Sequence, residues 1–567
     1  MIGCPTLPIT RRPPSSFLDP KQVMDRYCSI SCGTAASVGV LSHVLYFVRG
    51  EHHQHTLQFL QILFYGFLSS SLILAPLLQV QYAQAMQLTF MLIGSYLTAL
   101  WTSMLIYRVS FHRLNAFPGP RLAKLSKFYQ LFTGLRLDAF RRSHEAHQRY
   151  GRFVRTGPNE LSVISPGAPA AILGPRSSCI RSPWYDYSLY QSMESLHSTR
   201  DVAAHEARRR VWDHGFSVKA LRDYEGRVTG YTHELIEKIS TLSGTTMNAS
   251  AWFNYWSFDV MGDFAFGKSF NMLKTGKNHF AIDWLESSMI LLGIFSPIPW
   301  AVPVGSIAPI VGRCFRRFIR WCNEQVDERR DIKTTVPDIT SWLLKTAHDK
   351  NDVEATKWLH GDSRLLIVAG SDTVAIVLTY IFYYLARNPT HTQKLREELK
   401  PLMLSGEPFN VRMVQNAKHL NGVINEALRL HPPTPSGGFR TTPPDGITVD
   451  GVFIPGGVNL NVPIYALGRS EECFVRPDDF VPERWYSKPE LILDRSGFAP
   501  FSLGPYGCIG KELAKMEMRT VVPLLISRFD VRLAPGEDGS RLLYKSRDAF
   551  TMRLEELRVI FEERKRG

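Results

Sequence analysis

A single cysteine in a glycine-punctuated loop is the residue of this chain with the clearest chemical potential. Cys508 lies in the segment FSLGPYGCIG, residues 501–510, which precedes a helix-like run over 511–525. Glycines at 504, 507 and 510 allow the backbone to approach a flat partner closely and to take positive φ angles. A thiolate held there, with the positive start of a helix behind it, is suited to be the fifth ligand of haem iron. On spacing alone, a buried cysteine in an ordinary loop remains an equal alternative.

This segment resembles the haem loop of the cytochrome P-450 family, F-x-x-G-x-R-x-C-x-G. Phe501, Gly504, Cys508 and Gly510 match the pattern in register, which implies that they surround haem (iron protoporphyrin) and that the cysteine is its axial iron ligand. Tyr506 stands where the family usually has an arginine that pairs with a haem propionate. A tyrosine hydroxyl can donate a hydrogen bond but brings no charge, so other residues must balance the propionates.

Further motifs of the family follow the expected order along the chain. Glu426 and Arg429 match E-x-x-R, and residues three apart share a helical face, so they can form an ion pair. The His-Pro-Pro sequence at 431–433 ends that helix. Arg484, within Pro-Glu-Arg-Trp, matches the arginine that joins this pair in the family to brace the haem loop. Each motif alone fits an ordinary helix or surface loop, but their order implies a structural role for all three residues.

An acid beside a hydroxyl interrupts the long apolar run 365–385. The sequence Ala369-Gly370-Ser371-Asp372-Thr373 resembles the family's oxygen-activating motif, in which the small residues leave room for dioxygen beside a helix. A threonine hydroxyl can replace a backbone hydrogen bond and open the helix locally. Asp372 and Thr373 together would supply a proton relay and are the predicted catalytic residues. A buried helix with a polar kink is the alternative.

Three residues are candidate partners of the haem propionates. His205 and Arg209 resemble the family's W-x-x-x-R helix, with histidine in place of tryptophan, and residues four apart share a face. Both can donate to a carboxylate, and arginine can do so bidentately. Arg208 and Arg210 are expected to point elsewhere, toward solvent or a partner. Arg440 stands where the family often has another propionate partner, although an ordinary strand residue also fits there.

Composition indicates a globular protein with a membrane part. The chain has 567 residues, of which 44% are hydrophobic and 21% charged, and its net charge is +14. The eight cysteines show neither disulfide nor zinc spacing, which indicates reduced thiols in a domain that faces the cytosol. No nucleic-acid motif accompanies the positive charge, so a membrane surface and an acidic redox partner explain it better than nucleic acid does.

The first 117 residues differ from the rest of the chain. Segments 56–80 and 85–107 are uncharged, apolar and long enough to cross a bilayer, and 28–48 is a third, marginal candidate. Positive residues lie before the first segment and after the last, which favours both flanks in the cytosol and an even number of spans. Segment length favours three spans instead. Two and three transmembrane helices both remain open.

The motif Phe117-Pro-Gly-Pro120 resembles the family's hinge between membrane anchor and catalytic domain. We therefore expect a membrane region over 1–117 and a catalytic domain over 118–567. Helical patterns dominate between 200 and 430, and short β-like pieces occur at 153–164 and 446–463. The expected fold is mainly α with a small β subdomain, as in the cytochrome P-450 family, preceded by the membrane region.

The resemblance implies a haem-thiolate monooxygenase that inserts one oxygen atom of dioxygen into a lipophilic small molecule. The chain has no recognisable flavin or nicotinamide domain, so a separate NADPH-dependent cytochrome reductase is the expected electron donor. Basic residues at 511, 515 and 519 face either this partner or solvent. Segments such as 258–270 resemble fungal members, which implies a secondary-metabolite intermediate as substrate. The expected location is the endoplasmic reticulum membrane, with the catalytic domain in the cytosol.

Two other functions share the same cysteine. A haem-thiolate isomerase or dehydratase would need neither dioxygen nor a reductase, and a non-catalytic membrane haem protein would need no proton relay. The pair Asp372 and Thr373 argues against both, because only oxygen activation requires it. Dependence of turnover on reductase and NADPH separates the three functions.

Overall fold

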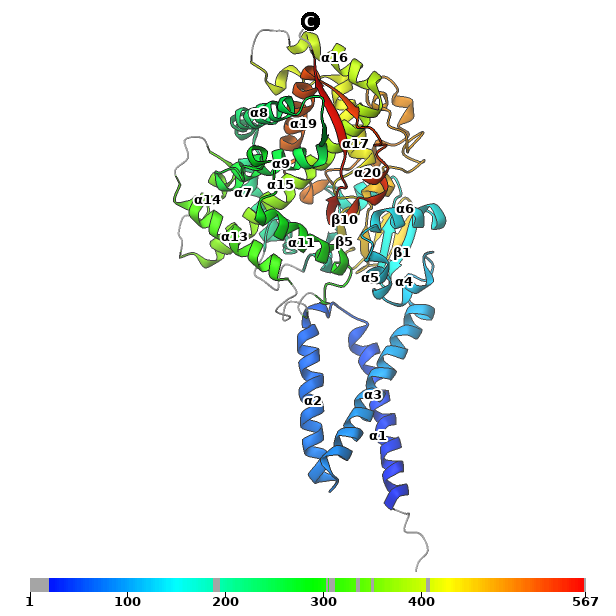
Figure 1. The fold of residues 1–567 in the computed structure, drawn as a ribbon. Helices are drawn as coiled ribbons and strands as arrows, with labels where there is room; N and C mark the ends of the chain where they lie inside the picture. The colour runs from blue at the N-terminus through cyan, green and yellow to red at the C-terminus, as the bar shows by residue number, and fades with distance from the viewer. Residues whose placement is uncertain are drawn as a thin grey trace, which may run out of the picture. The chain divides into compact units, whose positions relative to one another are not determined.

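The computed structural model describes residues 20–186, 194–301, 304, 312–332, 337–347, 351–403 and 408–564. Backbone contacts divide the chain into two compact units, with the boundary between His112 and Arg113. The first unit consists of long helices, whereas the second holds the shorter helices, the longest helix and the strands described (Figure 1). Each unit is described separately below.

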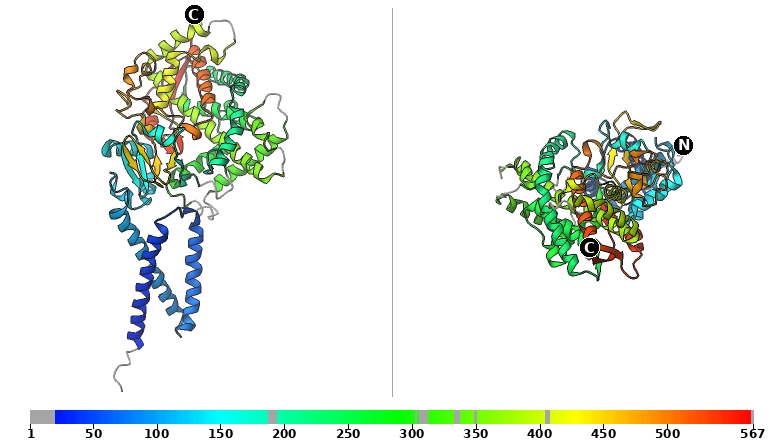
Figure 2. Two further views of the ribbon diagram at one scale, coloured as in Figure 1. Left: turned by 180° about the vertical axis from the view of Figure 1, so that it is seen from behind. Right: turned by 90° about the horizontal axis from the view of Figure 1, so that it is seen from above.

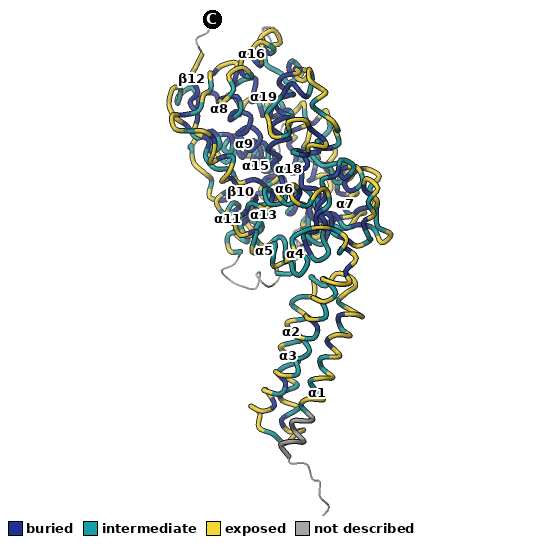
Figure 3. The backbone as a smooth tube through the Cα atoms, turned by 90° about the vertical axis from the view of Figure 1, so that its right-hand side faces the viewer, coloured by how far each residue is buried: buried dark blue, intermediate teal, exposed yellow. Residues whose placement is uncertain are grey.

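The first unit contains three helices that are long and apolar enough to cross a membrane. They are α1 (Pro20–Ser42), α2 (Thr56–Leu77) and α3 (Tyr82–Ile106), and with their flanking turns the candidate spans are Cys28–Phe47, His53–Leu77 and Tyr82–Phe111. Their apolar side chains are mostly exposed or half-buried, whereas dark-blue buried segments concentrate in the second unit (Figure 3). Apolar helices with so little buried surface are typical of segments that lie in lipid.

Helices α1 and α3 pack closely through a small residue. A Cβ atom added to Gly39 would lie 2.4 Å from the carbonyl oxygen of Tyr96, so only glycine permits this approach. Four residues later, His43 Nδ1 lies 2.8 Å from Ser103 Oγ on the facing helix. Small residues and interhelical hydrogen bonds are the usual means by which membrane helices associate.

The second unit is mainly helical. Its helices are α4 (Arg121–Leu125), α5 (Phe128–Gly134), α6 (Ala139–Tyr150), α7 (Val202–Gly215), α8 (Val218–Thr241), α9 (Ala249–Phe266), α10 (Met272–Thr275), α11 (Phe280–Phe295), α13 (Arg313–Arg330), α14 (Ile339–Leu344), α15 (Val353–Arg387), α16 (Pro389–Met403), α17 (Lys418–Leu430), α18 (Ile464–Leu467), α19 (Lys511–Arg528) and α20 (Ser540–Lys545). Within this unit, the green helices gather on one side and the cyan and yellow strands on the other (Figure 2).

Helix α15 is the centre of the hydrophobic core. It begins at Val353 and runs for 35 residues, and the side chain of Asp352 caps its start by accepting a hydrogen bond from the Ala355 amide. It is also apolar enough to cross a membrane, but most of its apolar stretch is buried inside the second unit. The residues 369–373 interrupt the apolar run but not the helix, which is continuous through them.

The strands form small sheets at the edge of this core. The largest has the order β1 (Phe153–Gly157), β2 (Glu160–Val163), β8 (Asn459–Asn461), β5 (Phe439–Thr441) and β3 (Ile180–Arg181). A second sheet contains β4 (Thr246–Asn248), β12 (Arg558–Glu563) and β9 (Phe529–Leu533), and two hairpins pair β6 (Ile447–Val449) with β7 (Val452–Ile454) and β10 (Arg547–Ala549) with β11 (Thr551–Arg553). The prediction of a mainly α fold with a small β part is confirmed.

The proline-rich motif lies against the first strand of the large sheet. The Pro118 carbonyl accepts a 2.7 Å hydrogen bond from the Arg155 amide. A Cβ atom at Gly119 would lie 2.3 Å from the Arg155 carbonyl oxygen, so a side chain at this position would force the two segments apart. The motif is therefore packed as an added edge segment of β1.

Candidate active site

The loop that carries Cys508 is held by its own backbone. The Cys508 amide donates to the Phe501 carbonyl at 2.8 Å, and the Gly507 amide donates to the Gly504 carbonyl at 2.9 Å. Gly504 has φ +65°, and a Cβ atom there would lie 2.6 Å from the Leu173 carbonyl oxygen. Both the backbone conformation and the close contact therefore require glycine at this position. The expectation of positive φ angles is wrong for the two other glycines, at 507 and 510, which have ordinary negative values.

The Cys508 thiol faces open space at the start of α19. Its side chain is exposed, yet protein atoms enclose it closely enough that desolvation raises the pKa of the thiol. The backbone amides of Gly510 and Lys511 and the Arg209 guanidinium oppose this rise, because each stabilises negative charge on the sulfur. A bound metal ion would deprotonate such a thiol, and the amides are already arranged to receive the thiolate.

A buried charge network lies on α17 and the segment after Val481. The Glu426 carboxylate accepts hydrogen bonds from Arg429 at 2.7 and 3.0 Å and from Arg484 at 2.8 Å. The Val481 amide and the Trp485 indole also donate to it, at 3.0 and 2.9 Å. The three charged side chains have no exposed surface, and such a network is stable only because every charge is paired.

Tyr506 lies inside a cluster of basic side chains. The guanidinium carbons of Arg181 and Arg440 lie 4.4 and 4.7 Å from the centroid of its ring. The His205 ring lies 4.6 Å from the same ring, and His197 completes the cluster from beside Tyr185. Burial, followed by the charge of Arg181, lowers the pKa of each histidine to about 3, so both histidines are neutral.

This cluster fits the carboxylate groups of a haem. The Nε atom of Arg440 and the Nε2 atom of His197 are buried without a hydrogen-bond partner among the described residues. The contacts described for Arg440 go to the Tyr185 hydroxyl and the Phe439 carbonyl, and neither carries charge. Buried cations are stable only when anions pair with them, so the donor set calls for anionic groups from a ligand. The cysteine of this loop and the basic cluster around Tyr506 of the same loop meet both needs of a haem, a sulfur ligand for iron and partners for its carboxylates.

Sequence reasoning missed Arg181. Its strand, β3, pairs with β5 so that Arg181 lies directly opposite Arg440. Its Nη1 atom donates to the carbonyls of Leu196 and Thr199, at 3.0 and 2.7 Å, which hold the side chain under Tyr506. No motif in the sequence marks a residue whose role depends on the register of two short strands.

Helix α7 presents two different faces. On one face, Arg209 donates to the Gly507 carbonyl at 2.7 Å and to Asp213 at 3.1 Å, so it holds the cysteine loop. The expectation that Arg208 points to solvent or a partner is wrong. Arg208 is buried and pairs with Asp362 of α15, which also accepts the Trp212 indole at 2.7 Å.

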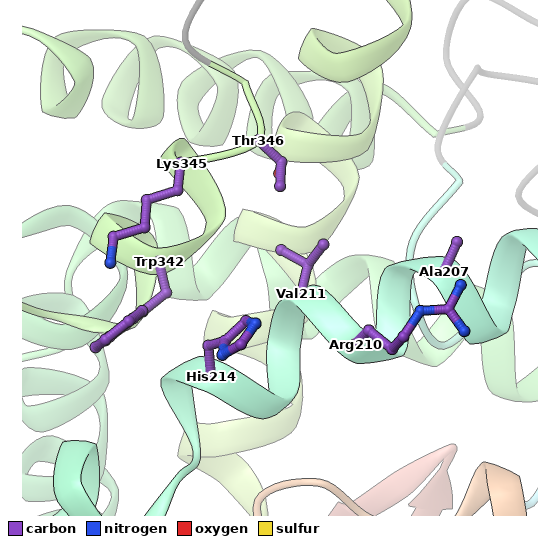
Figure 4. Close-up of a pocket in the computed structure, with 7 residues that line it drawn as sticks. All are labelled: Ala207, Arg210, Val211, His214, Trp342, Lys345 and Thr346. Carbon is purple, nitrogen blue, oxygen red and sulfur yellow. The ribbon is translucent and has the colours of Figure 1, made fainter.

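The other exposed face of α7 borders a separate pocket. Together with α14 it encloses a cavity of about 410 Å³. Figure 4 shows the aromatic ring of Trp342 beside His214, with Lys345 above it and Arg210 on the neighbouring turn. Its lining includes neither Cys508 nor a member of the basic cluster, so it is not the haem site.

The acid and the hydroxyl of α15 have different partners. The Thr373 hydroxyl donates to the Ala369 carbonyl at 2.9 Å, which is the local bond expected for a threonine within a helix. Asp372 accepts a hydrogen bond from the Thr551 hydroxyl of β11 at 3.3 Å. The small size of Gly370 lets α9 approach, because a Cβ atom there would lie 2.4 Å from the Met261 methyl group of α9.

Aromatic side chains stack on the segment after β3. The Trp184 ring lies between Phe439 of β5, at 5.1 Å, and Phe550 of the β10–β11 turn, at 5.5 Å. Phe550 has φ +80°, a strained conformation for a bulky residue. Phe439 directly precedes Arg440, and Phe550 directly precedes Thr551. The aromatic surface is therefore next in sequence to a member of the basic cluster and to the partner of Asp372.

Comparisons with known proteins agree on one family. The family model "Cytochrome P450" matches residues 120–561. A cytochrome P450 monooxygenase of Aspergillus versicolor is 42% identical over 530 residues, covering 93% of this chain and 96% of that protein. Tryprostatin B 6-hydroxylase of Neosartorya fischeri is 40% identical over 546 residues, covering 94% of this chain and 99% of that protein. A cytochrome P450 monooxygenase of Fusarium pseudograminearum is 39% identical, with 93% and 96% covered.

Proposed function

The chain belongs to the cytochrome P450 family, and from this premise we propose that it oxidises an aromatic, lipophilic small molecule at a haem held by Cys508. It is a monooxygenase, as its relatives at about 40% identity are named. Haem, when bound, activates dioxygen so that one oxygen atom enters the substrate. The protein residues bind and orient the haem and the substrate, exclude water from the site and move protons.

The observation that carries the ligand assignment is the thiol of Cys508 at the start of α19. The amides of Gly510 and Lys511 direct their hydrogens at the sulfur and would stabilise a thiolate there. Phe501 and Gly504 fix the loop through the backbone bonds described above. The buried pair Glu426–Arg429, joined by Arg484, keeps the neighbouring segment in place and has a structural role.

The haem carboxylates are assigned to the basic cluster. Arg440 and Arg181 bring two charges, and Tyr506 and His205 bring hydrogen-bond donors without charge. This assignment explains how the chain does without the family's usual arginine at position 506. Arg209 acts on the loop backbone through Gly507, so its proposed contribution to haem binding is indirect.

Thr373 and Asp372 are proposed to handle protons during turnover. The half-buried hydroxyl of Thr373 can position a water molecule beside the substrate. The carboxyl group next to it can accept and return protons, because burial and the charge of Glu286 raise the pKa of Asp372 to about 7. A group with a pKa close to the working pH exchanges protons most readily.

The substrate class is inferred from the aromatic stack. Trp184, Phe439 and Phe550 offer flat apolar surface of the kind that binds planar rings. Two relatives are named as hydroxylases of one small molecule, tryprostatin B. We therefore favour an aromatic secondary-metabolite intermediate of a fungus over an aliphatic chain.

The partners and the location follow from the class of enzyme. A P450 monooxygenase needs dioxygen and an electron donor, and we assign that role to a separate NADPH-dependent reductase. The apolar N-terminal helices anchor the protein in a membrane, which we propose is the endoplasmic reticulum. The described cysteines of the second unit form no disulfide, which supports a catalytic unit in the cytosol.

Product formation under defined conditions tests this function. Membranes that contain the full chain and a fungal reductase are supplied with NADPH, ¹⁸O₂ and a panel of aromatic and aliphatic lipophilic compounds. We expect one labelled oxygen atom in an aromatic product and no turnover without NADPH. Turnover that does not depend on NADPH and gives a product without ¹⁸O would instead identify an isomerase or dehydratase. Preference for aliphatic compounds would contradict the proposed substrate class.

A further inference from the structure

Strand β11 connects the acid of α15 with a second acid nearer the surface. Residues two apart on a strand point to the same side, and Thr551 and Arg553 are so placed. The Thr551 hydroxyl donates to Asp372 Oδ2 at 3.3 Å, and Arg553 Nη2 donates to Glu286 Oε2 of α11 at 3.0 Å. Helix α15 contacts β11, and α11 contacts β10 of the same hairpin (Figure 1).

We propose that Thr551, Arg553 and Glu286 form the solvent-side end of the proton supply to Asp372. This inference rests on the proposed function of Asp372 and names the route by which that residue is recharged. In it, Thr551 relays the proton, Glu286 receives the proton from solvent, and Arg553 is a positioning residue that holds Glu286.

Exposure rises from Thr551 to the outer pair, Glu286 and Arg553. Thr551 is 5% exposed, whereas the side chains of Glu286 and Arg553 are 33% and 43% exposed. A proton from bulk water can therefore reach Glu286 directly, and the Thr551 hydroxyl links this hairpin to the half-buried carboxyl group of Asp372. The hydroxyl of Thr551 has its hydrogen directed at Asp372 and keeps its oxygen lone pairs for a water molecule on the outer side.

The proton transfer balances without another reactant. The hydroxyl O–H bond of Thr551 breaks as an O–H bond forms on the Asp372 carboxylate. The Thr551 oxygen takes a replacement proton from the outer water molecule, which takes one from the Glu286 carboxyl group. Solvent then returns a proton to Glu286, so the net change is one proton moved from bulk water to Asp372.

The electrostatics of the two acids support the same route. Burial and then the charge of Glu286 raise the pKa of Asp372, whereas the Thr551 hydrogen bond and the Arg553 charge lower it. Burial also raises the pKa of Glu286, and Arg553 opposes this rise. These residues of α11 and β11 are the charged and hydrogen-bonding groups that act on Asp372. Removing the charge of Glu286 must therefore lower the pKa of Asp372, whereas removing the Thr551 hydroxyl must raise it.

Infrared titration of the full-length haem-containing protein tests the connection without turnover. The carboxylic C=O band of Asp372 is assigned by its loss in Asp372→Asn and followed with pH. Glu286→Gln should lower the midpoint by at least about half a pH unit, because a like charge is removed. Thr551→Val should raise it, because a bond to the carboxylate is lost, and Thr551→Ser should restore it.

A matched control lies one turn earlier on α11. Asp283→Asn also removes a negative charge, but from an exposed residue that does not act on Asp372. It should leave the midpoint unchanged. Equal shifts in Glu286→Gln and Asp283→Asn, or no shift in either Glu286→Gln or Thr551→Val, would overturn the proposal.

A solvent isotope effect gives the kinetic test. When proton delivery is slowed, the ratio of turnover in H₂O to turnover in D₂O should rise in Glu286→Gln and Thr551→Val but not in Thr551→Ser or Asp283→Asn. An unchanged ratio in the first two variants would also overturn the route. The infrared titration needs no product, so it tests the route even if the proposed reaction is not found. Failure of the proposed function and failure of this route are therefore distinguished.

Discussion

Tyr506 changes how charge is balanced beside the predicted haem. A tyrosine contributes a hydroxyl and an aromatic face, and both arginines of the cluster lie against that face. A guanidinium over an aromatic ring gains a modest attraction, and the Nε atom of Arg440 has no partner among the described residues, so it can donate to an anion. The tyrosine therefore supports two arginines from neighbouring strands instead of supplying one cation itself.

Removing one of these arginines should weaken haem binding. We expect Arg440→Met to increase the dissociation rate of haem by about 10- to 100-fold, since a hydrogen bond to a charged group contributes about 1.5–3 kcal/mol. Transfer of haem to an excess of apomyoglobin measures this rate. Arg152→Met is the control, because Arg152 is exposed and pairs with the exposed Glu472 at 2.6 Å. Equal rates in both variants would contradict the role of the cluster.

The Thr373 hydroxyl should determine how electrons are used. Thr373→Ala should still bind haem and substrate and still consume NADPH, but less of that NADPH should appear as product and more as hydrogen peroxide. A positioned proton donor contributes about 10²- to 10⁴-fold to a rate, which sets the expected loss of product formation. Thr373→Ser should recover most of it. Fully coupled product formation in Thr373→Ala would count against the relay and favour the isomerase alternative.

At the scale of elements, a buried charge network joins α17 to the irregular segment 475–485. Glu426 is bonded to Arg429, Arg484, Trp485 and a backbone amide, so its charge is fully satisfied. The arginines also bond several backbone carbonyls, including those of Gly468 and Val475. One carboxylate thus fixes the path of an irregular segment that has little regular structure of its own.

Neutralising this carboxylate should destabilise the second unit. Glu426→Gln leaves two buried arginines without their anion, which costs about 3–5 kcal/mol. Thermal loss of the haem absorbance should then occur at a clearly lower temperature. The control, Lys515→Gln, breaks the surface pair with Glu512 and should cost less than about 1 kcal/mol. Similar shifts in both variants would show that the network contributes no more than a surface pair.

Local sequence patterns predicted the parts of the site whose residues are close in sequence. The E-x-x-R pair and the cysteine loop depend on spacing within one helix or one loop, which the sequence states directly. Arg208 was wrongly placed because its partner, Asp362, is 154 residues away on another helix. Arg181 and Gly370 depend on a strand register and on a contact with Met261, and neither leaves a local signal.

At the scale of the whole molecule, the N-terminal unit should determine membrane attachment. We expect the full chain to stay in the membrane pellet after washing with alkaline carbonate, because its three long helices expose apolar surface. A chain that begins at Arg113 should lose most of this attachment. Recovery of the full chain in the carbonate supernatant would contradict a membrane-spanning unit.

The number of transmembrane helices in the N-terminal unit can be tested separately. With three spans, the N-terminus and the second unit lie on opposite sides of the membrane, whereas two spans leave them on the same side. A glycosylation acceptor site fused before Met1 should be modified in microsomes if all three helices span. An unmodified acceptor, together with intact membrane attachment, would favour two.

The ligation of iron by Cys508 is the central claim, and the spectrum of the reduced carbon monoxide complex tests it most directly. The full chain should show the strongly red-shifted Soret band that a thiolate ligand produces, and Cys508→Ser should lose it. Cys314→Ser replaces a half-exposed cysteine on α13 and should keep it. A red-shifted band that persists in Cys508→Ser would contradict the assignment of the ligand and the account of the site built on it.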